Sequence, residues 1–237
     1  KMTINESDLQ YIDDGNKQSG KLQKLLDEQG NKLSLLVIDD NNDIRQYVRT
    51  LLQDEFYVFE ASDGKEGLEI ARKEVPDLVI CDVMMPVMNG LEFTEQLKTQ
   101  TITSHIPVIM LTAKNLDEHR AEAYEHGADS YITKPFHSKV LLSRIENLLK
   151  QRRLLKTHFE NIFNQTSQTA EQEVAMNQLE DRDKQFLNQL HAIIQKNLSD
   201  SEFGVEDIGK GIGLSRVQLY RKVKAMTGSS VVDLLRP

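Results

Sequence analysis

The region 33–150 predicts an α/β fold in which five parallel strands form a doubly wound sheet. Two observations predict this class. Short β-branched or apolar runs alternate with amphipathic segments that are long enough to cross the sheet. Runs such as LVIC and PVIM are apolar at every position, which is typical of strands that are covered by helices on both sides.

The expected elements alternate strictly along this region. The five strand runs are LSLLVID, FYVFEA, DLVICD, IPVIML and DSYIT. A helix is expected after each of them, near 42–53, 64–73, 90–100, 117–126 and 138–152. The sequence therefore predicts five consecutive βα units.

The segments that flank this region differ from it in composition. Residues 1–32 are polar and are interrupted by three glycines, so we interpret them as a linker. Residues 151–182 are poor in strand formers and predict a helical extension followed by a connector. Apolar residues in 183–237 recur at helical spacing and predict an all-α segment. Its helices are expected to begin at Asp183 and to continue near 205–211, 215–226 and 229–235.

The composition limits the classes of protein to consider. A length of 237 residues allows one large or two small domains, and the net charge of -8 argues against a wholly basic nucleic-acid coat. A single cysteine, Cys81, excludes an internal disulfide and fits a reducing compartment. No apolar run reaches the ~18 residues of a membrane span, so we expect no membrane contact in this segment and a cytoplasmic location. The terminal residues suggest a piece of a longer chain.

Polar residues that are unusual for a sheet follow four of the five strands. Asp39 and Asp40 follow the first strand, Asp82 ends the third, Thr112 the fourth and Lys134 the fifth. Ligands of doubly wound sheets bind at these carboxyl ends. Three gathered carboxylates need a cation, for which Mg²⁺ is well suited. One carboxylate then becomes a nucleophile toward phosphorus, while Thr112 and Lys134 contact phosphoryl oxygens.

Each of these residues has a simpler explanation when it is taken alone. Asp39 and Asp40 precede a helix and would serve equally well as an N-cap with a first-turn acid. Taken alone, Asp82 is typical of a turn residue. Thr112 is typical of a residue at a strand end whose hydroxyl already has a hydrogen-bond partner, and Lys134 of a side chain whose ammonium group is in solvent. Their joint occurrence at four strand ends favours a site.

Residues 33–150 resemble the receiver domain of two-component response regulators in the motifs VIDD, VICDVMMPVMNG, IMLTAK and YITKPF. The resemblance implies a flavodoxin-like (βα)5 fold in which Asp82 accepts a phosphoryl group from a histidine kinase. It further implies that Asp39, Asp40, Asp82 and the main-chain carbonyl of Met84 bind Mg²⁺.

The same resemblance implies a switch. Thr112 and Lys134 would sense the phosphoryl group, and Tyr131 matches the switch aromatic of the family. A cis peptide is implied between Lys134 and Pro135. Phosphorylation would change the surface of the fourth helix, fifth strand and fifth helix, through which a homodimer is expected.

A basic segment lies near the C-terminus. Between Gly209 and Ser230 there is no acidic residue, and the pattern predicts two short helices that are separated by a turn at Gly213, with Ser215 as the second N-cap. Apolar packing is expected from four residues of the second helix, namely Val217, Leu219, Tyr220 and Val223. Four others are expected to face outward toward double-stranded DNA, namely Arg216, Gln218, Arg221 and Lys222. A solvated helical hairpin without a partner is the alternative.

Residues 183–237 resemble the start of an AraC-type DNA-binding domain, notably in DIGKGIGLSRVQLYRKVKAMTGSSVVDLLR. That family has two helix-turn-helix units, of which this chain shows the first, so weak DNA binding is expected. The order of receiver, connector and AraC-type unit resembles the C-terminal part of hybrid two-component sensors. Their sensory and kinase parts lie upstream.

The sequence therefore predicts a phosphorylation-controlled transcription regulator whose own chemistry is its phosphorylation and dephosphorylation. One alternative is a receiver that acts as a docking module without DNA output. Another is an Asp-nucleophile phosphatase of the haloacid dehalogenase type, but this class needs Asp-x-Asp after the first strand, where the chain has DDNN. Histidine kinase activity is not expected here, because His158 lacks an SHELRTP-like box and no glycine-rich ATP lid follows it.

Overall fold

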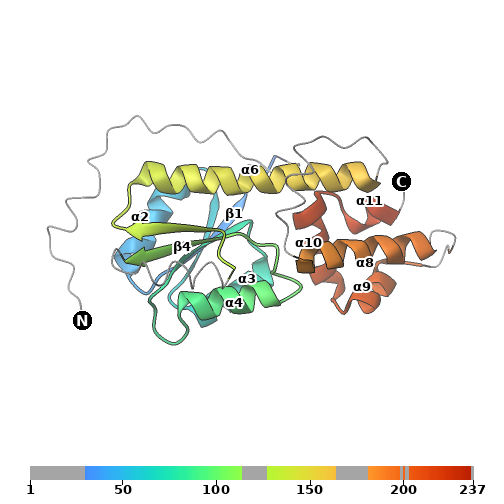
Figure 1. The fold of residues 1–237 in the computed structure, drawn as a ribbon, viewed down its shortest axis with the longest axis horizontal. Coiled ribbons are helices and arrows are strands. Elements are labelled where there is room, and N and C mark those ends of the chain that lie inside the picture. The colour runs from blue at the N-terminus through green and yellow to red at the C-terminus, as the bar shows by residue number, and fades with distance from the viewer. Residues whose placement is uncertain (1–29, 114–126, 164–180, 198–199, 201–202, 236–237) are drawn as a thin grey trace. The chain divides into compact units, whose positions relative to one another are not determined.

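The computed structural model describes residues 30–113, 127–163, 181–197, 200 and 203–235 (Figure 1). They divide into two compact units, which are described separately. The first holds the sheet and most of its helices, up to residue 96 and from 106 to 149, and the second holds residues 97–105 and the chain from residue 150 on, with the C-terminal helices. The helix expected near 117–126, the linker up to residue 29 and the connector from 164 to 180 lie outside the described residues.

The first unit is built on one sheet of five parallel strands in the order β2-β1-β3-β4-β5. The strands are β1 (Ser34–Ile38), β2 (Tyr57–Ala61), β3 (Leu78–Asp82), β4 (Val108–Ala113) and β5 (Ser130–Lys134). The predicted five-stranded parallel α/β sheet is thus confirmed. The strand order reverses between β1 and β3, so their carboxyl ends flank the crevice where ligands of such sheets bind.

In the part of the chain that the structure describes, four helices cover the two faces of the sheet (Figure 1). They are α2 (Asn42–Leu52), α3 (Gly64–Glu74), α4 (Gly90–Thr99) and α6 (Ser138–Phe163). α2 and α6 lie on one face, and α3 and α4 lie on the other. α6 continues to Phe163, into the segment from residue 151 where a helical extension was predicted.

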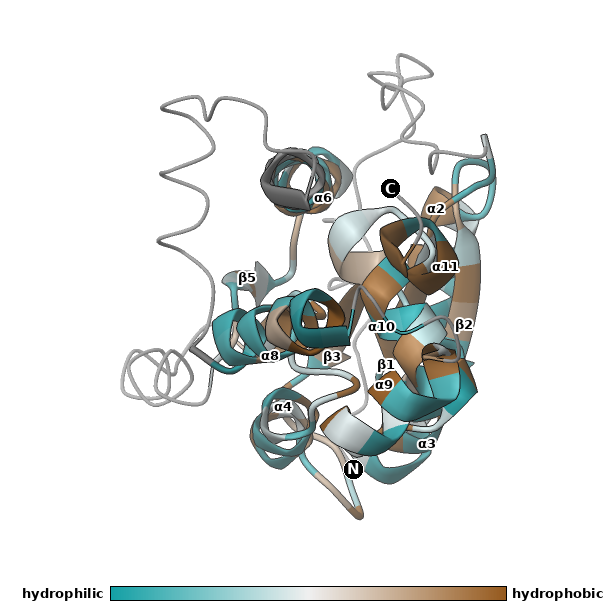
Figure 2. Cartoon of the chain, turned by 90° about the vertical axis from the view of Figure 1, so that its right-hand side faces the viewer, coloured by the Kyte–Doolittle hydropathy of each residue, from teal (hydrophilic) through white to brown (hydrophobic). Residues whose placement is uncertain are grey.

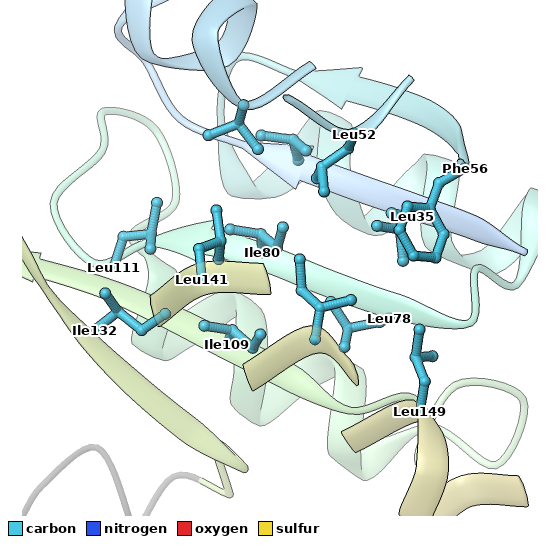
Figure 3. Packing of buried hydrophobic residues seen from close by; sticks show 13 residues of the cluster. Leu35, Leu52, Phe56, Leu78, Ile80, Ile109, Leu111, Ile132, Leu141 and Leu149 are labelled. Atoms are coloured by element: carbon cyan, nitrogen blue, oxygen red, sulfur yellow. The ribbon is translucent and has the colours of Figure 1, made fainter. Parts of the chain in front are cut away.

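The core explains why the strands are apolar at every position. Leu35 of β1 belongs to a cluster with Leu52 of α2 and Leu141 of α6 (Figure 3). Successive residues of a strand point to opposite faces, so the residue after Leu35 faces the other side of the sheet. On that opposite face, a Cβ at Gly67 of α3 would lie 2.4 Å from Ile38 Cδ1. Both faces of β1 are therefore closely packed, which fixes the position of its carboxyl end.

The second unit consists of α8 (Asp181–Asn197), α9 (Val205–Ile212), α10 (Arg216–Thr227) and α11 (Val231–Leu235). The prediction of an all-α segment is confirmed. α8 and α9 each have one hydrophilic and one hydrophobic side (Figure 2). Apolar side chains of α8, α9, α10 and α11 form a separate core of Phe186, Leu187, Leu190, Ile194, Ile208, Leu219, Val223, Met226 and Val231. Among the described residues, no helix is long and apolar enough to span a membrane.

Candidate functional site

Three carboxylates meet at the carboxyl edge of the sheet. Asp39 and Asp40 follow β1, and Asp82 is the last residue of β3. One oxygen from each lies within 4.8 Å of the others, and Asp39 and Asp82 are buried while Asp40 is exposed. The strand ends that were predicted to converge do so.

Lys134, the last residue of β5, joins this group. Its Nζ lies 2.7 Å from Asp39 Oδ2 and 2.9 Å from Asp82 Oδ1. An ammonium group therefore balances part of the charge of two buried carboxylates. The side chain of Lys134 is 21% exposed, so this cation is reached from solvent.

The backbone after β1 fixes Asp39. The N–H of Asn41 donates to Asp39 Oδ1 at 2.9 Å, and Arg45 Nη1 donates to the Asp39 carbonyl oxygen at 2.6 Å. Asn41 itself is the N-cap of α2, because its side chain accepts from the N–H of Asp43. The alternative in which Asp39 or Asp40 caps this helix is therefore wrong.

The loop after Asp82 is held by two close approaches of glycine. Gly90 donates its N–H to the Val83 carbonyl at 3.0 Å, and a Cβ at Gly90 would lie 2.1 Å from the Asp82 carbonyl oxygen. Gly64 at the start of α3 donates to the Met88 carbonyl at 3.1 Å. A side chain at Gly64 or Gly90 would block these approaches, so glycine is needed for the loop to return to the end of β3.

Burial and charge set the protonation of the site. Burial raises the pKa of Asp82 to about 6; Asp39 and Asp40 add to this rise, whereas Lys134 opposes it. Burial alone would lower the pKa of Lys134, but the adjacent carboxylates of Asp82 and Asp39 hold it above its usual value. The ionised form of the Asp82 carboxyl group is therefore less stable than that of an ordinary aspartate. This favours its reaction as a nucleophile.

Thr112 lies on β4, which is next to β3, and Tyr131 lies on β5, the edge strand beyond β4. Thr112 of β4 is buried, pairs in register with Thr133 of β5, and donates its hydroxyl to the Ala113 carbonyl at 3.4 Å. Tyr131 is half-buried on β5 opposite Met110. The peptide bond between Lys134 and Pro135 is cis, as the resemblance implied. The switching roles of these residues stay predictions.

The chemistry of the donor set fits a hard divalent cation. Carboxylate oxygens of Asp39, Asp40 and Asp82 lie within 4.8 Å of one another, and each is the kind of ligand that Mg²⁺ takes in proteins. Asp40 is exposed, so the cluster opens to solvent at one side and leaves room for retained waters. The side chain of Met84 is 65% exposed, and a metal role for its main-chain carbonyl stays a prediction.

A second candidate site lies on α10 in the helical unit. Gly213 ends α9 with a left-handed φ of 80°, and Ser215 caps α10, as predicted. Ser215 Oγ accepts from the N–H of Gln218, and Gln218 Oε1 accepts from the N–H of Ser215 at 3.1 Å. This capping box holds the Gln218 side chain at the start of the helix.

The outward face of α10 differs from the predicted one. The expectation that Lys222 faces outward is wrong, because Lys222 is fully buried. Its Nζ lies 3.1 Å from Asp183 Oδ1 of α8 and 4.8 Å from the centre of the Phe186 ring. These two α8 side chains, together with the Ser104 hydroxyl 3.0 Å from Lys222 Nζ, compensate the buried charge.

Two expected packing residues of α10 are instead exposed. Val217 is 62% exposed and Tyr220 is 42% exposed, whereas Leu219 and Val223 are buried as expected. Arg216 is exposed and Arg221 is half-buried. The spacing of Leu219, Val223 and Met226 marks the buried side of the helix, and this signal would have placed Lys222 beside it.

Comparison with known proteins relates the first unit to a family. Residues 35–146 match the model of the response regulator receiver domain. Histidine kinase P4 of Formosa agariphila is 35% identical over 196 residues, which are 83% of this chain and 14% of that protein. The phosphate regulon transcriptional regulatory protein PhoB of Escherichia coli is 39% identical over 118 residues, which are 49% of this chain and 52% of that protein. The chain therefore spans only a part of each relative.

Among solved structures, the chemotaxis protein CheY4 of Vibrio cholerae is 36% identical and covers 49% of this chain and 98% of its own, with a TM-score of 0.47. The segment that matches the family model holds the whole sheet and its acidic edge. Residues 35–146 are therefore a response regulator receiver domain, homologous to the receivers of regulators and histidine kinases in phosphorylation-controlled two-component signalling.

Proposed function

We propose that Asp82 accepts a phosphoryl group from the phosphohistidine of a histidine kinase. The observation that carries this proposal is the convergence of Asp82 with Lys134 at 2.9 Å and with two further carboxylates within 4.8 Å. An oxygen of Asp82 attacks phosphorus while the bond from phosphorus to the histidine nitrogen breaks. The products are an acyl phosphate and a free imidazole.

Asp39, Asp40, Asp82 and the Met84 carbonyl would hold Mg²⁺, which when bound offsets the charge of the incoming phosphoryl oxygens. The residues of the chain perform the remaining tasks. Lys134 is already next to Asp82 and is placed to pair with a phosphoryl oxygen. Asn41 and Arg45 keep Asp39 in position while the charge of the site changes.

The response to phosphorylation rests on Thr112 and Tyr131. The hydroxyl of Thr112 would leave the Ala113 carbonyl and donate to the phosphoryl group, which is the stronger, charged acceptor. Tyr131 would then move into the space beside it. The altered surface on β5 and α6 would form the homodimer. Cys81 is buried and free, which fits the reducing cytoplasm that we propose as the site of this reaction.

The test is phosphorylation by acetyl phosphate with Mg²⁺, followed by intact-mass measurement. The wild-type chain is expected to gain one phosphoryl group, and Asp82→Asn to gain none, because an amide is not a nucleophile toward phosphorus. Asp54→Asn is the matched control, since Asp54 is an exposed acid in a turn outside the site. Phosphate uptake by Asp82→Asn equal to that of the wild type would move the role to another residue.

We also propose that the helical unit binds double-stranded DNA through α10. The segment from Gly209 to Ser230 is free of acidic residues, and Arg216 is exposed on it. The match to histidine kinase P4 covers 83% of the chain and so extends past the receiver, which supports a regulator or hybrid sensor in which both units occur together. Arg216, Arg221 and Lys224 would contact phosphates, whereas Lys222 is buried and takes no part.

Fluorescence anisotropy with a labelled duplex across a salt series tests the DNA proposal. Contacts to ~3–4 phosphates predict a log–log slope of roughly -3 to -4 and a dissociation constant on the order of 10⁻⁴–10⁻⁶ M at physiological salt. Arg216→Ala is expected to lower the slope by about one. Phosphorylation without any salt-dependent DNA binding would instead favour a docking module.

A further inference from the structure

We infer that Val217 and Tyr220 of α10 are specificity-determining residues that recognise the C5-methyl groups of thymine in the major groove. This inference rests on the proposed DNA binding and deepens it. Val217 is 62% exposed and Tyr220 is 42% exposed. They lie three residues apart on a helix whose other large apolar side chains, Leu219, Val223 and Met226, are buried.

The surroundings of this apolar pair indicate what covers it. Val217, Arg221 and Lys224 follow at spacings of four and three residues and so share one side of α10, and Arg216 is exposed next to Val217. An apolar contact framed by cations suits a polyanion that carries a small apolar group. The major groove of DNA offers this combination, because the thymine methyl is the apolar group among its base edges.

The two polar candidates for base contact are engaged elsewhere. Gln218 closes the capping box with Ser215, so its carboxamide oxygen is already an acceptor within the protein. The ammonium group of Lys222 lies in the interior beside Asp183. At the start of α10, where recognition helices touch bases, Arg216, Val217 and Tyr220 therefore present the exposed side chains.

The test compares two duplexes that differ only in the methyl group. The full chain is titrated, at low salt, against an alternating adenine–thymine duplex and an adenine–uracil duplex of the same length and charge. The wild-type chain is expected to bind the thymine duplex about fourfold more tightly for each methyl group that is removed from water. Val217→Ala and Tyr220→Ala are expected to lose most of this preference and to keep the salt slope, because no charge is removed.

Two control variants separate this inference from the proposal beneath it. Val232→Ala removes an exposed valine of α11 and is expected to keep the preference. Arg216→Ala is expected to weaken binding to both duplexes equally. Circular dichroism confirms that each variant folds.

Salt-dependent binding with equal affinity for both duplexes, or an unchanged preference in Val217→Ala, would overturn only the proposed recognition of the thymine methyl group. Lack of salt-dependent binding to either duplex would overturn the DNA proposal itself.

Discussion

Lys134 Nζ lies 2.9 Å from Asp82 Oδ1, so the last residue of β5 is paired with the last residue of β3. β4 separates these two strands in the sheet, and the long lysine side chain reaches across its end. The charge of the proposed phosphoacceptor is therefore linked directly to the strand and loop that carry Tyr131 and the cis peptide. A phosphoryl group on Asp82 would compete for the same ammonium group.

Lys134→Ala is expected to separate phosphorylation from the response to it. The carboxylate nucleophile remains, so acetyl phosphate should still label the variant, although more slowly. The link from Asp82 to β5 is lost, so the labelled variant should dimerise more weakly than the wild type by about tenfold, the effect of roughly 1.4 kcal/mol. Sedimentation of the labelled proteins measures this. Wild-type dimerisation of labelled Lys134→Ala would show that Lys134 is not a sensor.

Asp82→Asn is expected to stabilise the receiver at neutral pH when the metal is removed with EDTA. The pKa of Asp82 is raised from its usual value of 3.8 to about 6, so the folded state binds more protons than the unfolded state between these values. The contribution of Asp82 to stability is therefore greatest below pH ~4 and falls as the pH rises toward ~6. The stability of Asp82→Asn does not fall in this way, because asparagine does not ionise. The variant should gain about 3 kcal/mol over the wild type above pH 6.

Urea unfolding of both proteins from pH 4 to 8 measures this difference. The curves of wild type and Asp82→Asn should separate between pH 4 and 6 and run parallel above. Asp54→Asn is the matched control, because it removes an exposed carboxyl group outside the site. A constant difference between wild type and Asp82→Asn at every pH would mean that Asp82 does not titrate in this range.

The first unit was predictable because its signals are local and repeat. Each strand is a short apolar run, and each functional residue stands at the end of one, so the topology alone brings Asp39, Asp82 and Lys134 together. The details of the site depend on contacts between distant residues. The pairing of Lys134 with two carboxylates, and the use of Asn41 instead of an aspartate as N-cap, follow from side-chain directions that a periodic pattern does not specify.

The exposed side of α10 was harder to predict, because every charged side chain on this helix was assumed to be exposed. Lys222 lies on the same side of the helix as Leu219 and Val223, and its buried charge is compensated by Asp183, by the Phe186 ring and by the Ser104 hydroxyl. Asp183 and Phe186 are 39 and 36 positions away in the sequence, and Ser104 is further still. The exposure of Val217 and Tyr220 follows from the same rotation of the helix.

Gly90→Ala is expected to reduce the rate of phosphorylation by about 100-fold. The new Cβ would lie 2.1 Å from the carbonyl oxygen of Asp82, so either the strand end or the loop must move. A displacement of ~1 Å at a reacting group can cost this much. Gly204→Ala is the control, because a Cβ at Gly204 meets no atom within 4 Å. The initial rate of labelling by acetyl phosphate measures the effect, and a rate within twofold of the wild type would show that the site tolerates the shift.

Asp183→Ala is expected to destabilise the helical unit strongly, by about 3 kcal/mol, because it removes a carboxylate 3.1 Å from the fully buried Lys222 ammonium group. Lys222→Met alone should also destabilise, since it leaves the buried Asp183 without this cation. The double variant should recover most of the loss, because methionine fills the volume of the lysine stem and no buried charge is left unpaired.

Hydrogen exchange at the backbone amides of Leu219 and Val223 reports the stability of this unit separately from that of the receiver. Faster exchange in each single variant and near wild-type exchange in the double variant are the expected results. Additive losses in the double variant would show that the two charges do not stabilise each other, and that α8 and α10 are held together by their apolar contacts alone.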